Sequence, residues 1–169
     1  MIAAAYHYAE PAKSRETITA QSAIVRAADG DSFVIGTRKF RLHGIDAPEW
    51  KQLCADAGGS NWQCGALSRR ALSALLAQPG LTCKVEAQDR FNRSVATCAT
   101  ANTGDIAAEQ VRAGMAITNE FNGLRAYGEE EDAARTAKRG LWQGSFTDPK
   151  LWRELNPHYI AAQRAMPIS

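Results

Sequence analysis

The stretch Phe40–Trp50, FRLHGIDAPEW, places one arginine and two carboxylates close to apolar residues and then breaks at a proline. Arg41 lies in an apolar, strand-like run, and Asp46 and Glu49 stand on either side of the break. A simple solvent-facing loop would not need an arginine and two acids so close to apolar neighbours. Charges that are buried beside apolar residues are costly unless they are paired. The stretch therefore predicts a strand that leads into a polar site.

The whole chain has the composition of a globular domain. Its 169 residues are 45% hydrophobic and 22% charged, which is enough to bury a real core. No apolar run approaches the roughly 20 residues of a membrane helix, so we expect no membrane partner. The formal net charge of +2 is too small to attract nucleic acid as a whole. Any phosphate binding must come from arginines placed locally.

Patterning divides the chain into three parts. Residues 1–20 are polar and predict a flexible N-terminal arm, without the basic start and long apolar centre of a secretory signal. Residues 21–145 predict the folded domain, and the turn-rich residues 146–169 predict an irregular C-terminal tail.

Periodicity within the domain indicates an α+β arrangement. Apolar and polar residues alternate from Ala20 to Ile45, which predicts strands, and a hairpin is expected over residues 83–98. Helices are expected within the segments 64–80, 104–117 and 128–142, where Pro79–Gly80, Gly114 and Gly140, respectively, end them. This order suits a curled or barrel-like sheet with helices packed on one side.

Four cysteines, Cys54, Cys64, Cys83 and Cys98, lack the spacing of a zinc site. A hairpin that turns at the midpoint of residues 83–98 places Cys83 across from Cys98, where a disulfide is feasible. Cys54 and Cys64 bracket a Gly/Ser/Asn loop and predict a second disulfide. Two disulfides imply an oxidising compartment, whereas the alternative is four buried thiols in a cytosolic protein.

Four acids are expected to converge on one end of the first hairpin, residues 32–42. They are Asp29, Asp31, Asp46 and Glu49. Carboxylates repel one another unless a cation or proton joins them, and Ca²⁺ is a natural solution because it takes several oxygen ligands. Arginines beside such a cation indicate a phosphate, whose oxygens match the guanidinium fork.

The pairing of Asp31 with Arg41 depends on how the first hairpin turns. A turn symmetric about Gly36 makes the two residues face each other, and a two-residue loop of Gly36 and Thr37 shifts the pairing by one. The plain structural alternative is a cross-strand ion pair that stabilises the sheet by at most about 1 kcal/mol.

Five motifs, DGDSFVI, FRLHGIDAPE, DRFNR, IAAEQVRAGMA and AKRGLW, occur in this order. Together they resemble the thermonuclease family, whose prototype is staphylococcal nuclease, over roughly Ile24 to Trp142. The resemblance implies a five-stranded OB-type β-barrel with three α-helices. It also implies a Ca²⁺-dependent phosphodiesterase that cuts DNA and RNA and leaves 5′-hydroxyl and 3′-phosphate ends.

The resemblance also implies roles for individual residues. Asp31, Asp46 and the backbone carbonyl of Ala47 match the family's calcium ligands, and Asp29 matches an acid close to the metal. Glu49 matches the acid that positions or deprotonates the attacking water, and residue types alone do not decide between these two roles.

The arginines match the family's phosphate-binding groups. Arg41 and Arg93 correspond to the two arginines that grip the reacting phosphate. Arg90 and Phe91 replace a lysine–tyrosine pair and keep a cation and an aromatic ring for the substrate.

The sequence departs from the prototype in two loops. Glu120 stands where a nucleotide-contacting tyrosine is expected, so Phe121 or Tyr127 is left to supply a stacking surface, with a packing role as the alternative. The cysteine pairs are absent from the prototype, and the segment between Cys54 and Cys64 replaces its mobile basic loop.

These observations predict a periplasmic or secreted, monomeric nuclease with little sugar or sequence specificity. A catalytically silent nucleic-acid-binding module on the same barrel is the alternative, but such modules lose carboxylates or arginines that this chain keeps. A third possibility, a disulfide-stabilised exported domain that binds another protein, leaves the charged constellation unexplained.

Overall fold

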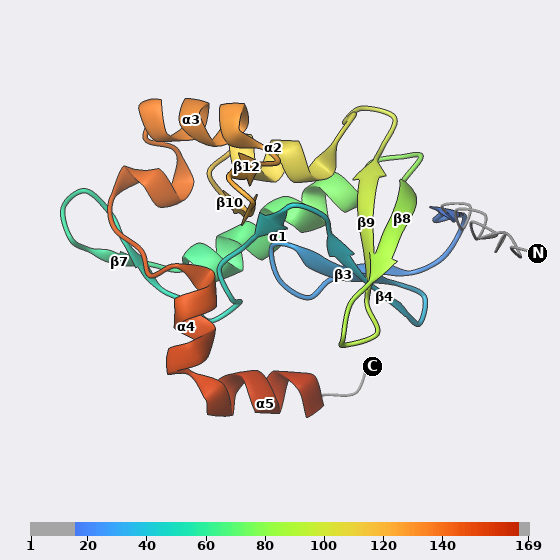
Figure 1. The fold of residues 1–169 in the computed structure, drawn as a ribbon, viewed down its shortest axis with the longest axis horizontal. Coiled ribbons are helices and arrows are strands. Elements are labelled where there is room, and N and C mark those ends of the chain that lie inside the picture. The colour runs from blue at the N-terminus through green and yellow to red at the C-terminus, as the bar shows by residue number, and fades with distance from the viewer. Residues whose placement is uncertain (1–15, 166–169) are drawn as a thin grey trace, which may run out of the picture.

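The computed structural model describes residues 16–165, so residues 1–15 of the predicted N-terminal arm lie outside the described part. The expectation of a flexible arm is wrong for Thr17–Thr19, which form a strand paired with residues 82–84. Its main feature is a strongly curled, six-stranded half-barrel sheet (Figure 1). The strands lie in the order β1 (Thr17–Thr19), β8 (Thr82–Gln88), β9 (Ser94–Ala99), β4 (Arg38–Leu42), β3 (Ser32–Ile35) and β2 (Val25–Ala27). The predicted α+β class is confirmed, with six strands in the main sheet where five were expected.

Three short ladders stand beside this sheet. They pair β5 (Ile45–Asp46) with β10 (Ile117–Thr118), β6 (Cys54–Ala55) with β7 (Asn61–Trp62), and β11 (Glu120–Phe121) with β12 (Leu124–Arg125). The first ladder sets Asp46 opposite Ile117, which fixes the backbone at one end of the FRLHGIDAPEW stretch.

The three predicted helices are present as α1 (Cys64–Leu76), α2 (Ile106–Arg112) and α3 (Gly128–Thr136). In Figure 1, α2 and α3 lie at the top of the molecule. Helix α3 ends before the predicted Gly140 because Lys138 has a φ of 52°, and a short 3₁₀ turn, η1 (Gly140–Gln143), follows.

The expectation of an irregular tail over residues 146–169 is wrong for most of that segment. Two further helices, α4 (Pro149–Leu155) and α5 (Pro157–Ala165), lie at the bottom of Figure 1. Asp148 caps α4 by accepting hydrogen bonds from the backbone N–H groups of Lys150 (2.8 Å) and Leu151 (3.3 Å). Pro149 fills the first helical position, where no N–H is needed.

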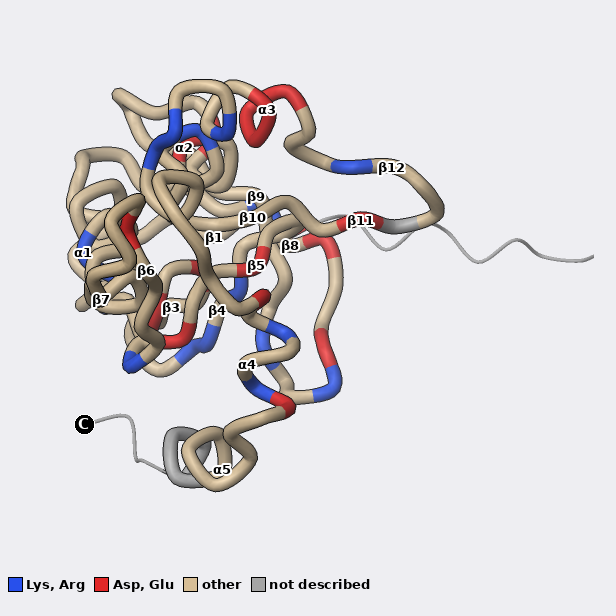
Figure 2. Tube along the Cα trace, turned by 90° about the vertical axis from the view of Figure 1, so that its left-hand side faces the viewer, with Lys and Arg blue, Asp and Glu red and all other residues tan. Residues whose placement is uncertain are grey.

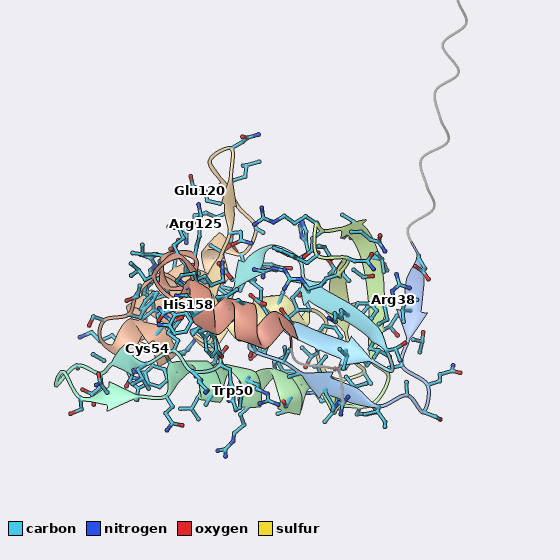
Figure 3. The ribbon with its side chains drawn as sticks, turned by 90° about the horizontal axis from the view of Figure 1, so that it is seen from below. Arg38, Trp50, Cys54, Glu120, Arg125 and His158 are labelled. Atoms are coloured by element: carbon cyan, nitrogen blue, oxygen red, sulfur yellow. A yellow bond between two sulfur atoms is a disulfide. The ribbon has the colours of Figure 1, made fainter. Side chains whose placement is uncertain are left out.

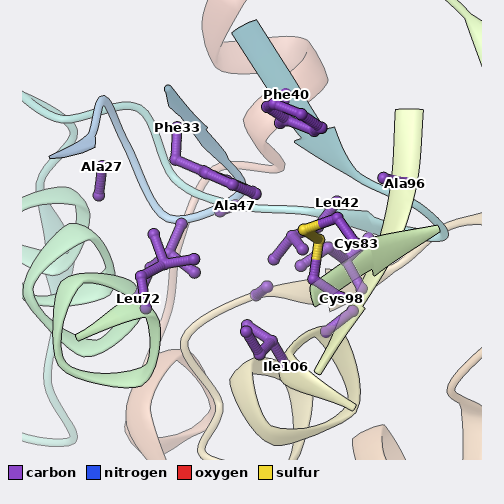
Figure 4. Packing of buried hydrophobic residues seen from close by; sticks show 14 of the residues in the cluster. Ala27, Phe33, Phe40, Leu42, Ala47, Leu72, Cys83, Ala96, Cys98 and Ile106 are labelled. Carbon is purple, nitrogen blue, oxygen red and sulfur yellow. A yellow bond between two sulfur atoms is a disulfide. The ribbon is translucent and has the colours of Figure 1, made fainter. Parts of the chain in front are cut away.

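The core lies between the inner face of the sheet, α1 and α2 (Figure 4). Phe33 stacks on Phe40 with ring centroids 5.3 Å apart, which joins β3 to β4. In the β3–β4 hairpin Ser32, rather than Asp31, pairs with Arg41, so the symmetric turn about Gly36 is wrong and the two-residue loop is present.

Both predicted disulfides are present, and they link Cys54 to Cys64 and Cys83 to Cys98. Cys83 and Cys98 are direct partners in the β8–β9 ladder, and the other disulfide joins β6 to the first residue of α1. Two disulfides favour an oxidising, extracytoplasmic environment. Among the described helices, none has the length and apolar character to cross a membrane.

Candidate active site

One guanidinium links the first two predicted carboxylates. Asp31 directly precedes β3, Arg41 lies on β4 and Asp46 ends β5, so three neighbouring segments deliver the three side chains. Nη2 of Arg41 lies 3.2 Å from Oδ2 of Asp31 and donates a 2.9 Å hydrogen bond to Oδ1 of Asp46. The carboxylates are therefore close enough to share one cation.

Asp31 is held rigidly by its neighbours. Its side chain is buried, and its Oδ1 accepts a hydrogen bond from the Ser32 hydroxyl (2.8 Å) while its Oδ2 accepts one from the Ala47 N–H (2.9 Å). Oδ1 of Asp29 accepts from the N–H groups of Asp31 (3.0 Å) and Ser32 (2.7 Å). These bonds fix both the backbone and the carboxylate plane at the start of β3.

Glu49 follows Asp46 by three residues and is 7% exposed. The chain around it packs against the start of α1 so closely that a Cβ on Gly65 would collide with the Glu49 carbonyl. The Glu49 N–H donates to the side-chain oxygen of the buried Gln52 (3.2 Å). The backbone that carries this carboxylate is therefore fixed on two sides.

We call Asp29, Asp31, Asp46 and Glu49 the carboxylate cluster. Burial raises the pKa of Asp31, and it also raises the pKa of Glu49, with repulsion from the Asp31 carboxylate as a second cause. Asp29 behaves in the same way, because burial and then the charge of Glu49 raise its pKa. The Asp31 carboxylate in turn raises the pKa of Arg41. The cluster thus favours added positive charge.

An arginine that the sequence did not predict, Arg153, enters the cluster from α4, which is drawn below β4 and β5 in Figure 2. Arg153 donates from Nη2 to Oδ2 of Asp46 (2.7 Å) and from Nη1 to Oδ1 of Asp46 (2.9 Å). Its Nη1 also donates to Oε1 of Glu49 (3.2 Å). Asp148 followed by Pro149, a helix-start signal, was the available hint that this segment is ordered.

Arg93 lies at the edge of the cluster. Its Nε donates to Oδ2 of Asp89 (2.7 Å), and its Nη1 donates to the Ser32 hydroxyl (3.3 Å), which in turn donates to Asp31. The second predicted phosphate-binding arginine is therefore connected to Asp31 through Ser32.

The tip of the β8–β9 hairpin, residues 89–93, carries the predicted substrate-binding pair. The Phe91 ring is 39% exposed. The Arg90 guanidinium lies 4.8 Å from the ring centroid and that of Arg93 lies 5.6 Å from it. The tip thus presents an aromatic ring and the exposed cation of Arg90, with the half-buried Arg93 beside the ring.

The loop in which Glu120 replaces an expected tyrosine contains the two candidates for a stacking surface, Phe121 and Tyr127. Tyr127 packs against the core and donates its hydroxyl to Oδ2 of Asp105 (3.1 Å), so it has the packing role rather than an open stacking surface. Glu120 lies on the β11–β12 hairpin, which projects from the body with Arg125 on the opposite strand (Figure 3). Phe121 is the residue after Glu120 on β11.

The donor set has the chemistry of a hard-cation site. Buried carboxylate oxygens from Asp31 and Asp46 lie around one guanidinium nitrogen, and the Ile45 carbonyl lies 3.3 Å from the same nitrogen. Such oxygens suit Ca²⁺. Within residues 16–165, no group of three or more Asp, Glu, His or Cys side chains is already arranged as a metal site. Arg41 and Arg153 both form ion pairs with Asp46.

Comparison with known proteins assigns the chain to a family. The family model described as staphylococcal nuclease homologue matches residues 39–144, and the chain belongs to this family. It is also similar to the succinoglycan biosynthesis protein ExoI of Rhizobium meliloti (strain 1021), with 30% identity over 133 residues. That match covers 78% of this chain and 68% of ExoI.

Proposed function

We propose that the protein is a Ca²⁺-dependent phosphodiesterase that hydrolyses DNA and RNA with little sugar or sequence specificity. The observation that carries this proposal is the sharing of Arg41 between the buried carboxylates of Asp31 and Asp46, with Glu49 beside them. Membership of the staphylococcal nuclease homologue family supports it, and we take the curled sheet to be the family's OB-type barrel.

Asp31, Asp46 and the carbonyl of Ala47 would hold the cation. When bound, Ca²⁺ supplies positive charge against the phosphate and lowers the cost of ionising a nearby water. The raised pKa of Asp31, which burial causes, fits a carboxylate that a cation would hold in its ionised form.

The remaining charged side chains act on water and phosphate. Glu49 holds the attacking water or takes its proton. Arg41 and Arg93 donate to the equatorial phosphate oxygens, where charge grows as the water oxygen bonds to phosphorus. The bond from phosphorus to the 5′ oxygen breaks, that oxygen takes a proton from solvent water, and Glu49 returns to solvent any proton that it took from the attacking water. The products are a 5′-hydroxyl and a 3′-phosphate.

The hairpin tip would bind the substrate beside the reacting phosphate. Phe91 offers a face on which a base can stack, and Arg90 adds charge for the backbone. Both contacts tolerate any base and either sugar, which fits a nuclease with little specificity.

The setting of the enzyme is also a proposal. The two disulfides support a periplasmic or secreted location, and we propose that the protein acts as a monomer. A catalytically silent nucleic-acid-binding module is the second candidate. It is disfavoured because the chain keeps the buried carboxylates Asp31, Asp46 and Glu49 together with Arg41, and has Arg93 at their edge.

One assay separates the two candidates. Plasmid DNA and RNA are incubated with the full chain in Ca²⁺ or in chelator, and the product ends are identified by labelling. We expect cleavage of both nucleic acids in Ca²⁺, 5′-hydroxyl ends, and no cleavage in chelator. Binding of both nucleic acids without cleavage would favour the silent module, and full cleavage in chelator would remove Ca²⁺ from the proposal.

A further inference from the structure

We propose that Arg153, contributed by the C-terminal helix α4, is a positioning residue that orients the carboxylate of Glu49 for the reaction. This inference rests on the proposed nuclease function, since it concerns the group that acts on the attacking water. It extends the site beyond residues 39–144, which the family model matches, to a helix that follows them.

The contact geometry supports a positioning role. Arg153 reaches Oε1 of Glu49 at 3.2 Å with the same Nη1 atom that donates to Asp46 at 2.9 Å. Its Nη2 fixes the plane of the guanidinium through a 2.7 Å bond to the other oxygen of Asp46. A two-point contact with Asp46 therefore sets where the third contact, to Glu49, must fall.

A buried glutamine holds Glu49 and the start of α4 in register. The side chain of Gln52 is fully buried, and its oxygen accepts from the Glu49 N–H (3.2 Å). Its Nε2 donates to the carbonyl of Thr147 (2.7 Å), which directly precedes the helix cap Asp148. The Gln52 side chain thus links the backbone of Glu49 to the start of α4, the helix that carries Arg153.

Helix α5 contacts both α4 and the segment that follows Glu49. Trp152 of α4 packs edge-on against Tyr159 of α5, with ring centroids 5.2 Å apart. The Lys51 ammonium lies 5.9 Å from the Tyr159 ring centroid, so α5 rests on the segment that carries Glu49. The side chain of Arg153 is 25% exposed, so substituting it should not open the core.

The same contacts predict an effect on cation binding. Both oxygens of Asp46 accept from Arg153, so a cation that binds Asp46 must share it with, or displace, one guanidinium nitrogen. If a cation takes Oδ2 of Asp46 from Nη2, the two bonds of Nη1, to Oδ1 of Asp46 and to Oε1 of Glu49, are left to hold Glu49 in orientation.

The test uses the full chain with Arg153→Gln, Arg153→Lys and the control Lys150→Gln, which removes an equal charge from an exposed position on the same helix. Turnover and KM are measured on an oligonucleotide, and Ca²⁺ binding is measured by calorimetry. We expect Arg153→Gln to lower kcat by roughly 10–100-fold with KM changed less than about twofold. Arg153→Lys should recover part of that loss.

Calorimetry gives a readout that does not need turnover. We expect Arg153→Gln to bind Ca²⁺ roughly tenfold more tightly, because Asp46 loses a competing cation, and Lys150→Gln to match the wild type. A lower Tm with normal kcat would reduce Arg153 to a structural contact, and a higher kcat would make it a barrier to catalysis. Either result overturns the inference. A wild-type chain that binds Ca²⁺ but cleaves nothing would instead overturn the proposed function.

Discussion

The carboxylate cluster and the tip of the β8–β9 hairpin carry charged side chains in opposite surroundings. In the cluster, Asp31 and Asp46 are only 2% and 6% exposed, and each is bonded to several donors. At the tip, Phe91 is 39% exposed and lies beside the exposed Arg90 and the half-buried Arg93. The hydrogen bonds of the carboxylate cluster hold its side chains in one arrangement, whereas the exposed side chains of the hairpin tip can adjust to a bound ligand.

This difference assigns separate tasks to the two regions. Charged groups that are already desolvated and oriented stabilise a transition state without further rearrangement. The surface ring of Phe91 and the exposed cation of Arg90 add affinity for a flexible strand but fix no reacting atom. We therefore expect changes in the cluster to reduce the rate of the chemical step, and changes at Arg90 or Phe91 to weaken binding.

The largest effect is expected from Asp46→Asn. The substitution keeps the size of the side chain and removes a charge that both Arg41 and Arg153 contact. We expect turnover to fall by at least about 10³-fold, or ~4 kcal/mol, together with loss of Ca²⁺ binding by calorimetry. Glu154→Gln, at an exposed position on α4, is the control and should change neither quantity. Normal turnover in Asp46→Asn would remove the cluster from the chemistry.

The next largest effect is expected from Arg41→Lys. Lysine keeps the charge but loses the planar guanidinium, whose Nη2 contacts both Asp31 and Asp46 and whose fork would bind the phosphate in the proposed mechanism. We expect kcat to fall by about 10²–10³-fold while the melting temperature stays close to that of the wild type. The matched control is Arg38→Lys on the same strand, whose arginine contacts Glu16 instead of the cluster. Equal activity in the two variants would make Arg41 a structural ion-pair residue.

A smaller effect is expected from Gly65→Ala, which tests the rigid support behind Glu49. The new Cβ would collide with the Glu49 carbonyl, so that backbone must move. We expect a destabilisation of about 1–3 kcal/mol and a drop in turnover of roughly 10–10²-fold from misplacement of the carboxylate. Gly104→Ala is the control, because nothing lies within 4 Å of its added Cβ. Matching activities of the two variants, measured well below their melting temperatures, would contradict this support.

The smallest effect is expected from Phe91→Ala at the exposed tip. Loss of one stacking surface should raise the dissociation constant for single-stranded DNA about fivefold, or ~1 kcal/mol, and leave kcat unchanged. Phe91→Tyr keeps the ring and should bind like the wild type. Fluorescence anisotropy in Ca²⁺-free buffer measures the binding step alone. A fall in kcat without a change in binding would place Phe91 in the chemistry and erase the contrast with the cluster.

Local sequence patterns predicted the elements that short-range rules control. The three main helices and the β8–β9 hairpin follow from periodicity. The Cys83–Cys98 disulfide follows from cysteines placed symmetrically about a turn, and the Cys54–Cys64 disulfide from cysteines that bracket a Gly/Ser/Asn loop. The grouping of Asp31, Arg41 and Asp46 was also predictable, because a single hairpin and the following strand carry all three.

Contacts between distant segments could not be read from the sequence. Arg153 lies 107 residues from Asp46 in the chain, and nothing local to either residue indicates their pairing. Gln52 and Gly65 are similar cases, because their importance comes from Thr147 and Glu49 lying against them. The exact hairpin register also depended on one loop residue, which the alternation of apolar and polar residues does not decide.

The most direct test compares the two regions in one experiment, using single-turnover cleavage of one labelled oligonucleotide by excess enzyme in Ca²⁺. Wild type, Arg41→Lys and Phe91→Ala are titrated to saturation, so that the maximal rate and the half-saturating concentration are separated. We predict a maximal rate about 10²–10³-fold lower for Arg41→Lys with little change in half-saturation, and the opposite pattern for Phe91→Ala. A normal maximal rate for Arg41→Lys would contradict the assignment of the buried cluster as the active site.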